Sequence, residues 1–368
     1  MRVALLTYST RPRGGVVHTL ALAEALAGLG VDVTVWTLGR GGDGGFFRPV
    51  DPQVHVEVVP LPHLEGEGVG ERIVRSIAVL GAALAAHEQA GGAYDVVHAQ
   101  DCISANAVPR CVRTIHHLDT VTTPELVACH ERAVVRPYAH VCVSESVAAE
   151  VRAGWGLAPV VIPNGVEASR FAAAAGDPAA VAPWRRRFGR YVLAVGGIEP
   201  RKGTLDLLEA YALVRDRLPD LSLVIAGGET LFDYRAYRAA FDARAAELDV
   251  EVQVLGPVDH ALLPGLVAGC AAFGFVSTKE GFGLAALEAL AAGAPVVARP
   301  LPVLREVLGE HVRYGSDPGE MAEALLASVE DGPLPGGGGL AHRYTWRAAA
   351  ERHLDLYRSL SGASAAHA

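Results

Sequence analysis

Two carboxylates flank a glycine-rich helix start in the segment STKEGFGLAALEALAAGAPVVA, residues 277–298. Glu280 ends an expected strand, and a helix is expected over residues 284–292 with Glu288 on its flank. Glycines at a helix start let backbone N–H groups approach an anion, and carboxylates accept hydrogen bonds from hydroxyls. The pattern therefore predicts a ligand with a phosphate at the helix end and hydroxyl-bearing rings on either side. Taken singly, Glu280 as a helix cap and Glu288 as an exposed residue explain each carboxylate, but they leave the glycines unexplained.

A pair of cations marks a second candidate site, in the segment GGIEPRKGT at residues 196–204. Arg201 and Lys202 stand side by side before a helix that is expected to begin near Thr204. Two cations would repel the positive end of that helix unless an anion lies between them, which favours a phosphate-binding role over a solvated face. The chain has only two lysines, Lys202 and Lys279, among its 32 basic residues, so a lysine at this place is consistent with a site that needs a compact point charge.

A third candidate lies near the N-terminus, where RPRGGVVH follows the first expected strand. Gly14 and Gly15 immediately precede a helix, so their backbone is suited to contact an anion at the positive helix end. A turn that needs unusual backbone angles explains the same two glycines equally well. Two further segments fail as phosphate loops. Residues 39–44 match Gly-x-Gly-x-x-Gly without a helix pattern after them, and residues 199–204 lack the Gly-x4-Gly-Lys-Ser/Thr spacing.

Strand-like and helix-like segments alternate along the whole chain and position these candidates. Apolar runs such as RVALLTY and YVLAVGG are separated by amphipathic segments such as TLDLLEAYALVRDRL. Strict alternation predicts parallel sheets covered by helices on both faces, and two such series predict two Rossmann-like, doubly wound domains of the α/β class. Ligands in such sheets bind outside the carboxyl ends of the strands, where all three candidates fall.

An Ala- and Pro-rich segment places the domain boundary near residues 168–188. We expect the first domain over residues 1–175 and the second over residues 185–340. The final helical pattern, residues 344–361, has no partner strand after it, so its pattern alone allows it to pack on either domain.

The composition is that of a globular enzyme acting on small molecules. The chain has 368 residues, more than one hydrophobic core normally organises, and 51% of them are apolar. The net charge is −9, with 12 basic and 16 acidic residues in the first 165 and 20 and 25 in the rest, which argues against nucleic acid and against docking by charge on an anionic membrane. The uncharged residues 260–278 are broken by Pro and Gly, which indicates a buried helix and strand rather than a membrane span.

Cysteine usage and the N-terminus bear on the compartment. The five cysteines include no Cys-x-x-Cys pair, which indicates reduced thiols rather than a disulfide framework or a standard zinc site. The apolar run at the N-terminus is too short for the core of a signal peptide. We therefore expect a cytoplasmic protein.

Together these segments resemble the family 4 retaining glycosyltransferases, the glycosyl transferase group 1, which have the GT-B fold. The resemblance rests on GGVVH near the N-terminus, TIHH at 114–117, VSES followed by VIPNGVE, GGIEPRKG, and above all EGFGLAALEALAAGAPVV. It covers roughly residues 2–360 in the family's order, and the interval from Glu280 to Glu288 is the family's signature. It implies two Rossmann-like domains with a cleft between them and a final helix that crosses back to the first domain.

The resemblance also implies roles for individual residues. Arg201 and Lys202 would neutralise the diphosphate of a nucleoside diphosphate sugar, Glu288 would bind its ribose, and Glu280 would contact the hydroxyls of its sugar. His116 matches the family's Thr-x-His position near the transferring carbon and would stabilise the sugar rather than act as a nucleophile. The other implied donor contacts come from Gly14, Gly15, Gly281, Phe282, Gly283 and Leu284.

The implied reaction moves the sugar to an acceptor hydroxyl with retention of anomeric configuration. No Asp-x-Asp triplet occurs in the sequence, so we expect no metal and no other cofactor, and the cations and a helix end would stabilise the departing diphosphate. The sequence does not distinguish the two mechanisms of retention, double displacement and front-face attack. The acceptor is a small molecule or a glycan, with contacts expected from the variable loops at residues 39–52, 62–72 and 118–124.

Three other classes of protein compete with this interpretation. A nucleotide-sugar epimerase of the same overall fold would also bind a diphosphate between two domains, but it is not expected to carry EGFGLAALE. A dehydrogenase would need a dinucleotide fingerprint that opens a helix, which residues 39–44 do not supply. A non-enzymatic two-domain solute-binding protein would need an export signal. The sequence therefore favours a transferase.

Overall fold

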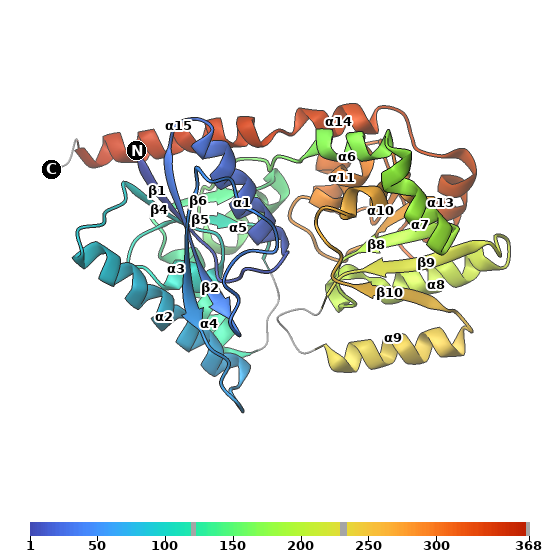
Figure 1. The fold of residues 1–368 in the computed structure, drawn as a ribbon, viewed down its shortest axis with the longest axis horizontal. Helices are drawn as coiled ribbons and strands as arrows, with labels where there is room; N and C mark the ends of the chain where they lie inside the picture. The colour runs from blue at the N-terminus through green and yellow to red at the C-terminus, as the bar shows by residue number, and fades with distance from the viewer. Residues whose placement is uncertain (119–122, 229–233, 366–368) are drawn as a thin grey trace. The chain divides into compact units, whose positions relative to one another are not determined.

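The computed structural model describes residues 1–118, 123–228 and 234–365 and divides into two units (Figure 1). Unit 1 contains Met1–Gly165 together with the chain from Thr345 onward, and unit 2 contains Val166–Tyr344. The division therefore falls before the expected boundary at 168–188, and the helical segments there belong to unit 2. Part of the expected acceptor loop at 118–124 lies outside the described residues.

Unit 1 is built on a parallel seven-stranded sheet in the order β3-β2-β1-β4-β5-β6-β7. Its strands are β1 (Arg2–Leu6), β2 (Asp32–Arg40), β3 (His55–Leu61), β4 (Val96–Ala99), β5 (Val112–Ile115), β6 (Ala139–Cys142) and β7 (Val160–Val161). Its helices are α1 (Gly14–Ala27), α2 (Val69–Gln89), α3 (Cys102–Asn106), α4 (Pro124–Val135), α5 (Glu145–Trp155) and α15 (Trp346–Ala365). Val3, Leu5, Val33 and Val35 are fully buried, because helices cover both faces of the central strands.

The C-terminal helix α15 belongs to unit 1 and packs against α1 (Figure 1). Ala350 and Tyr357 on this helix are fully buried. The Tyr357 hydroxyl forms a hydrogen bond of 2.6 Å with Nδ1 of His98, which lies on β4. The expectation that the final helix crosses back to the first domain is confirmed.

Unit 2 contains a parallel six-stranded sheet in the order β10-β9-β8-β11-β12-β13. Its strands are β8 (Arg190–Val195), β9 (Leu221–Ala226), β10 (Val252–Gly256), β11 (Ala272–Phe275), β12 (Val296–Ala298) and β13 (Arg313–Tyr314). Its helices are α6 (Ala168–Ala175), α7 (Pro178–Phe188), the 3-10 turn η1 (Pro200–Lys202), α8 (Thr204–Arg215), α9 (Arg235–Glu247), α10 (Leu263–Gly269), α11 (Leu284–Ala291), α12 (Pro302–Leu308), α13 (Pro318–Asp331) and α14 (Gly337–Arg343). Helix α8 packs on α13, and α11 packs on α14.

The Ala- and Pro-rich segment at the expected boundary forms α6 and α7, which pack on α10. Phe171 and Val181 from these helices are buried. Gly265 of α10 approaches so closely that a β-carbon there would lie 2.4 Å from the carbonyl oxygen of Ala180. Alanine is the best helix former, so a composition that resembles a linker here encodes two packed helices.

Both sheets reverse their strand order once, between β1 and β4 in unit 1 and between β8 and β11 in unit 2. In doubly wound proteins, ligands bind in the crevice outside the carboxyl ends of the two strands at such a reversal, the topological switch point.

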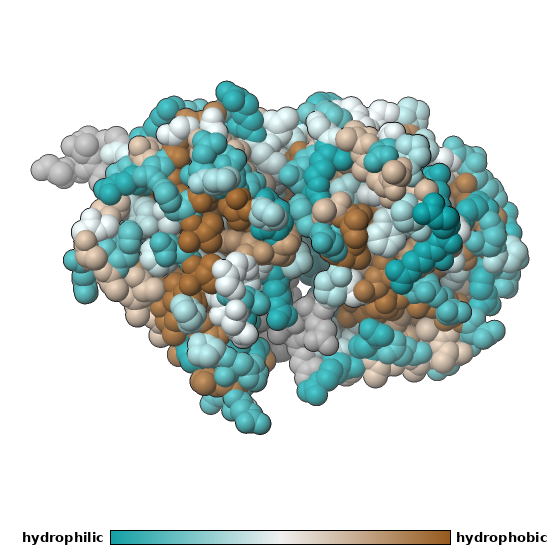
Figure 2. All heavy atoms as spheres, viewed as in Figure 1, coloured by the Kyte–Doolittle hydropathy of each residue, from teal (hydrophilic) through white to brown (hydrophobic). Residues whose placement is uncertain are grey.

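Residues 260–278 form α10 and β11, as expected, and the structure has no helix in its described residues that is long and apolar enough to cross a membrane. On the face drawn in Figure 2, hydrophilic and apolar side chains are interspersed over each unit.

Candidate active site

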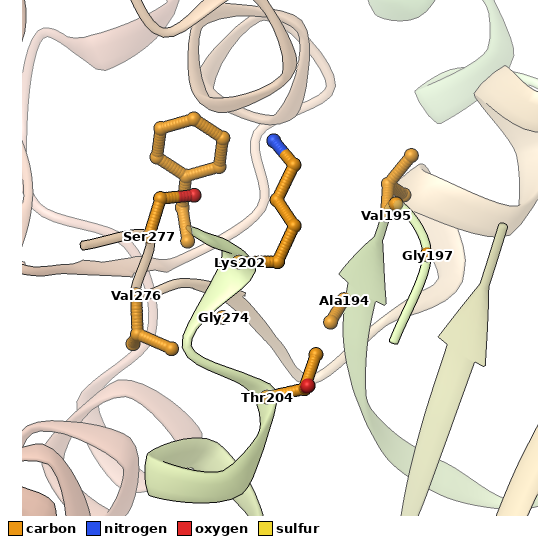
Figure 3. Close-up of a pocket in the computed structure, with 10 residues that line it drawn as sticks. Ala194, Val195, Gly197, Lys202, Thr204, Gly274, Val276 and Ser277 are labelled. Carbon is orange, nitrogen blue, oxygen red and sulfur yellow. The ribbon is translucent and has the colours of Figure 1, made fainter. Parts of the chain in front are cut away.

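The switch point of unit 2 holds a small pocket (Figure 3). Its lining comes from the ends of β8 and β11 and from the start of α8: Ala194, Val195, Gly196, Gly197, Lys202, Thr204, Gly274, Phe275, Val276 and Ser277. In Figure 3 the Lys202 side chain extends between Ser277 on one side and Val195 with Gly197 on the other. The segments GGIEPRKGT and STKEG, which are distant in the sequence, therefore converge at one place.

Glu280 joins these two segments through one carboxylate oxygen. Its Oε1 accepts hydrogen bonds from Lys202 Nζ at 2.8 Å, Ser277 Oγ at 2.8 Å and Arg201 Nη1 at 3.2 Å. Burial raises the pKa of Glu280, but the charges of Lys202 and Arg201 outweigh burial and lower this pKa to about 2. The carboxylate is therefore ionised throughout the neutral range. Its Oε2 has no hydrogen-bond partner in the described part of the chain.

A second carboxylate completes the charge balance of this pocket. Glu199 is buried and accepts a hydrogen bond of 3.2 Å from Arg201 Nη2. Arg201 and Lys202 therefore face two carboxylates, so the protein itself supplies the anion that the cations at this helix start were expected to require. A diphosphate that binds here must share or replace these ion pairs.

Two glycines in the left-handed region of backbone space shape the helix starts. Gly203 (φ 63°) precedes α8, and a β-carbon there would lie 2.4 Å from the Val276 carbonyl oxygen. Gly283 (φ 100°) precedes α11, where a β-carbon would lie 3.1 Å from Leu304 Cδ2. Neither helix is capped by the side chain of its N-cap residue, and Glu280 is not the cap of α11. In the first turn of α8, the Leu205 N–H donates a hydrogen bond of 3.2 Å to the Tyr237 hydroxyl.

The residues of the loop between Glu280 and α11 are buried or partly buried. Gly281 and Phe282 are buried, and the Phe282 ring packs edge-on against Tyr344 with 5.3 Å between ring centres. Leu284 is partly buried and is the first residue of α11, as expected. The Phe282 side chain therefore anchors the loop, while the loop backbone leads into the start of α11, which has no side-chain cap.

On α11, Glu288 is partly buried beside charged side chains of the segment that leads into α6. Burial and then the negative charge of Glu167 raise the pKa of Glu288 to about 8, against the opposing charge of Arg170. Arg170 donates hydrogen bonds to Glu167 Oε2 at 2.9 Å and to His260 Nε2 at 2.7 Å. In the free protein, Glu288 therefore holds its proton near neutral pH.

His116 and the two N-terminal glycines come together within unit 1. Gly14 and Gly15 form the start of α1, and neither lies in the left-handed region, so unusual backbone angles do not explain them. A β-carbon at Gly15 would lie 3.6 Å from Cδ2 of His116, which follows β5, while one at Gly14 would have no neighbour within 4 Å. The start of α1 is thus an open helix end beside His116.

The imidazole of His116 is held neutral. Burial, followed by the charges of His18 and Arg113, lowers the pKa of His116 well below its ordinary value. The His18 ring packs edge-on against it with 4.7 Å between ring centres, and His18 Nδ1–H donates to Asn164 Oδ1 at 2.8 Å. Nε2 of His116 is buried and has no hydrogen-bond partner among the described residues. A neutral imidazole with a free Nε2 is suited to a hydrogen bond with a sugar hydroxyl.

Sequence reasoning missed several neighbours of these residues. Glu199 lies inside a segment that was singled out, and Ser277 follows β11 at a strand end, so position was the available signal for both. No sequence signal predicts that Glu167 lies near Glu288, because their proximity depends on the packing of α6 and α11.

In the ranges that the structure describes, no three His, Cys, Asp or Glu side chains are grouped so as to hold a metal ion.

Two doubly wound parallel-sheet units are the architecture of the GT-B fold. The chain belongs to glycosyltransferase family 4: residues 187–343 match the family model Glycosyl transferases group 1, and residues 12–170 match the model Glycosyltransferase Family 4. This membership confirms the family expected from the sequence and replaces the alternatives of an epimerase, a dehydrogenase and a solute-binding protein.

Curated relatives cover nearly the whole chain. The D-inositol 3-phosphate glycosyltransferase of Salinispora arenicola is 31% identical over 384 residues, which cover 90% of this chain and 84% of that protein. The phosphatidyl-myo-inositol mannosyltransferase of Mycolicibacterium smegmatis is 29% identical over 394 residues, which cover 99% and 95% of the two chains. The chain is therefore similar throughout to glycosyltransferases.

Solved structures confirm the fold. Sucrose-phosphate synthase from Thermosynechococcus elongatus superposes with a TM-score of 0.77 at 21% identity, over 98% of this chain and 99% of that one. Anabaena HepE in complex with UDP and glucose superposes with a TM-score of 0.75 at 19% identity, over 98% and 100%. The expected GT-B fold is therefore correct.

Proposed function

We propose that this enzyme transfers a hexosyl group from a nucleoside diphosphate sugar to a hydroxyl of a small molecule or glycan, with retention of configuration and without a metal ion. The observation that supports this most directly is the convergence of Arg201, Lys202, Ser277 and Glu280 at the switch point of unit 2. Cations, a carboxylate with an unpartnered oxygen and the start of α11, which has no side-chain cap, meet there. This combination suits a ligand with a diphosphate and a hydroxylated ring.

In the proposed reaction, the bond between the anomeric carbon and the diphosphate oxygen breaks. A bond forms between that carbon and the acceptor oxygen, and the acceptor's hydroxyl proton passes to the departing diphosphate. Lys202 and Arg201 stabilise the charge that grows on the diphosphate, and Glu280 Oε2 accepts hydrogen bonds from the donor sugar. His116 binds the sugar near the reacting carbon.

The environment of Glu280 supports front-face attack over double displacement. Its Oε1 already accepts three hydrogen bonds, and a pKa of about 2 makes this carboxylate a weak base. A carboxylate so strongly stabilised as an anion is a poor nucleophile. We therefore assign Glu280 to binding and charge stabilisation, with a diphosphate oxygen as the base that receives the acceptor's proton.

Turnover is expected to survive chelation, because Arg201 and Lys202 supply the positive charge that a metal supplies elsewhere. A thermal-shift screen of uridine, guanosine and adenosine diphosphates identifies the base, since a ligand that binds only the folded state raises the melting temperature. Release of that nucleotide from its sugar conjugates is then measured with and without EDTA. Loss of most activity in EDTA that Mg²⁺ or Mn²⁺ restores would contradict the proposal.

Nucleotide affinity is expected to rise with pH, from about pH 6 up to the pKa of Glu288 at about 8. The ribose hydroxyls donate hydrogen bonds, which favour the ionised carboxylate, whereas the free protein holds the proton below that pKa. Binding therefore releases a proton, and the dissociation constant should fall up to about tenfold per pH unit in this range. Calorimetric titrations with the nucleoside diphosphate at several pH values measure this dependence.

The matched control is Glu288→Gln, which keeps the shape of the side chain but cannot release a proton. Any pH dependence that comes from the diphosphate itself persists in this variant, whereas the Glu288 contribution disappears. Equal slopes in the two proteins would show that Glu288 does not contact the nucleotide as a carboxylate.

A further inference from the structure

Two arginines, Arg13 and Arg40, contact Tyr8 at the switch point of unit 1, and the charge of a third, Arg72, acts on Arg40. We call Arg13, Arg40 and Arg72 the arginine cluster. Arg13 Nη1 donates to the Tyr8 hydroxyl at 2.9 Å, and the guanidinium carbons of Arg13 and Arg40 lie 5.8 Å and 5.3 Å from the centre of the Tyr8 ring. Burial lowers the pKa of Arg40, and the positive charges of Arg72 and Arg13 lower it further. Like charges have thus been gathered at a partly buried position.

The arginine cluster has no carboxylate paired with it. None of its members forms an ion pair with a residue in the described ranges, in contrast to Arg48, which pairs with Glu24 at 2.6 Å. Nε of Arg40 is buried and has no hydrogen-bond partner among the described residues. Asp101 also acts on the charge of Arg40, but its carboxylate accepts hydrogen bonds from backbone N–H groups at 2.9 Å and 2.8 Å. Glu67 acts on the charge of Arg72 in the same way, but its carboxylate forms an ion pair with Arg75. None of the three guanidinium groups therefore has a carboxylate paired with it in the described ranges.

The cluster lies where unit 1 is expected to bind a ligand. Tyr8 follows β1, Arg40 ends β2, and Arg13 and Arg72 stand at the starts of α1 and α2. Gly15, two residues after Arg13, is the glycine whose β-carbon would touch His116. The cluster is thus at the same sheet edge as His116.

Gln100 provides an independent sign of a missing ligand at this edge. It directly follows β4, the other strand at the switch point, and its backbone N–H donates to the Leu6 carbonyl oxygen at 2.9 Å. The residue is only 1% exposed, yet both polar atoms of its side-chain amide lack a hydrogen-bond partner in the described part of the chain. Buried amides without partners are rare in folded proteins and indicate an absent water or ligand.

We propose that the arginine cluster binds a phosphate ester on the acceptor, so that the enzyme glycosylates a phosphorylated polyol or sugar. This rests on the proposed function and names its acceptor class. Guanidinium groups bind phosphate oxygens in a bidentate fork, and a phosphate monoester carries nearly two negative charges, which matches three cations and one phenol. The phosphate is not consumed: it holds the acceptor in unit 1 while a neighbouring hydroxyl of the acceptor attacks the donor.

The first test is binding of inorganic phosphate, with the nucleoside diphosphate present to occupy the donor site. Phosphate should raise the melting temperature of the wild type relative to chloride at equal ionic strength. Arg40→Met and Arg72→Met should each weaken phosphate binding about tenfold or more, because each removes charge-assisted hydrogen bonds. Arg358→Ala, which removes an exposed arginine on α15, should bind phosphate as the wild type does. No phosphate effect, or an equal effect in all four proteins, would overturn the proposal.

Folding of the variants is not expected to confuse this result. Methionine keeps the apolar stem of Arg40 and removes a charge that is repelled by its neighbours, so Arg40→Met should melt no lower than the wild type. Arg72→Met provides the same readout from a different element, the first turn of α2. Retained phosphate binding in a well-folded Arg72→Met protein would count against the proposal on its own.

The second test compares acceptors that differ only in the phosphate. Transfer to glucose 6-phosphate should exceed transfer to glucose, and this preference should be lost in Arg40→Met.

A parallel assay uses phosphatidylcholine vesicles with and without phosphatidylinositol. It distinguishes a lipid headgroup from a soluble phosphate ester as the source of the phosphate, and transfer to either supports the phosphate site. Transfer only to neutral acceptors, at rates unchanged in Arg40→Met, would overturn this inference and leave the transferase function intact. Failure of all nucleoside diphosphates to bind would overturn the transferase function instead.

Discussion

Replacing Glu280 by alanine is expected to lower kcat by about 10²–10³, with a much smaller change in the KM for the donor. Glu280 is ionised at every pH above its pKa of about 2, so a full negative charge faces the donor sugar as positive charge develops at the reacting carbon. Alanine removes this stabilisation where it matters most, in the transition state. Steady-state kinetics with varied donor at saturating acceptor separate the two parameters.

Glu199→Ala is the matched control for Glu280→Ala, because both substitutions remove a carboxylate that forms an ion pair with Arg201. Glu199 is the other carboxylate on Arg201, at 3.2 Å, and in the described part of the chain it binds Arg201 alone, whereas Glu280 also binds Lys202 and Ser277. If Glu280 only balanced the charge of Arg201, the two variants would lose similar activity. Glu280→Gln should recover little, because the amide keeps the shape but not the charge. Normal turnover by Glu280→Ala would refute its catalytic role, even if the variant melted early.

Glu288→Ala should behave differently, because the ribose does not change during the reaction. Loss of that contact weakens the ground state and the transition state alike, so it should mainly raise the KM for the donor. Melting temperatures of both variants complete the comparison. The simplest structural alternative for Glu280, a helix cap, is already set aside, since Gly283 precedes α11 without any side-chain cap.

The regular parts of the fold were predictable because their sequence patterns are local. The alternation of apolar runs with amphipathic segments predicted both parallel sheets, and the glycine before Leu284 marked the start of α11 correctly. The two units divide between Gly165 and Val166, before the expected boundary at residues 168–188. Helices α6 and α7 are rich in alanine, which carries little periodicity, and only their packing on α10 shows that they belong to unit 2.

The candidate site was predictable by residue type but not by partner. Arg201, Lys202 and Glu280 were identified separately, yet the sequence does not show that the carboxylate binds both cations, because 78 positions separate Lys202 from Glu280. The arginine cluster escaped prediction for a similar reason. Arg40 and Arg72 belong to segments, residues 39–52 and 62–72, that were expected to contact the acceptor, but the approach of Arg40 to Tyr8 depends on the pairing of β1 with β2.

Unit 1 is expected to unfold steeply in acid, with three fully buried histidines together contributing a slope of about 4 kcal/mol per pH unit between about pH 6 and about pH 4. His18, His98 and His353 are fully buried. Burial lowers the pKa of His18 to about 3 and that of His353 to about 4, and it lowers the pKa of His98 well below its ordinary value.

The sign follows from the protons bound in each state. Below the unfolded pKa of about 6.5, each histidine in the unfolded chain takes up a proton that the native state does not bind. Unfolding is therefore favoured as the pH falls, until the native pKa is reached. Asp101 acts in the opposite sense, because burial raises its pKa and the native state binds its proton earlier. Unit 2 has no fully buried histidine among its described residues, so its stability should depend less on acid in this range.

Tryptophan fluorescence separates the two units. Trp36, Trp155 and Trp346 lie in unit 1 and Trp184 lies in unit 2, so a Trp184→Phe protein reports on unit 1 alone. Urea titrations of this protein at several pH values give the free energy of unfolding of unit 1. Circular dichroism follows both units together and shows whether they unfold at the same urea concentration.

A single substitution tests whether the buried histidines cause the slope. His353→Gln replaces a buried histidine whose Nδ1 bonds to the Ala349 carbonyl oxygen at 2.8 Å, and the glutamine amide retains a donor for that oxygen. The slope should fall by about 1.4 kcal/mol per pH unit, whatever the variant's stability at neutral pH, because one proton fewer is taken up on unfolding. His55→Gln, at a side chain that is 71% exposed, should leave the slope unchanged. Equal slopes in His353→Gln and the wild type would mean that carboxylates, rather than the buried histidines, drive the acid transition of unit 1.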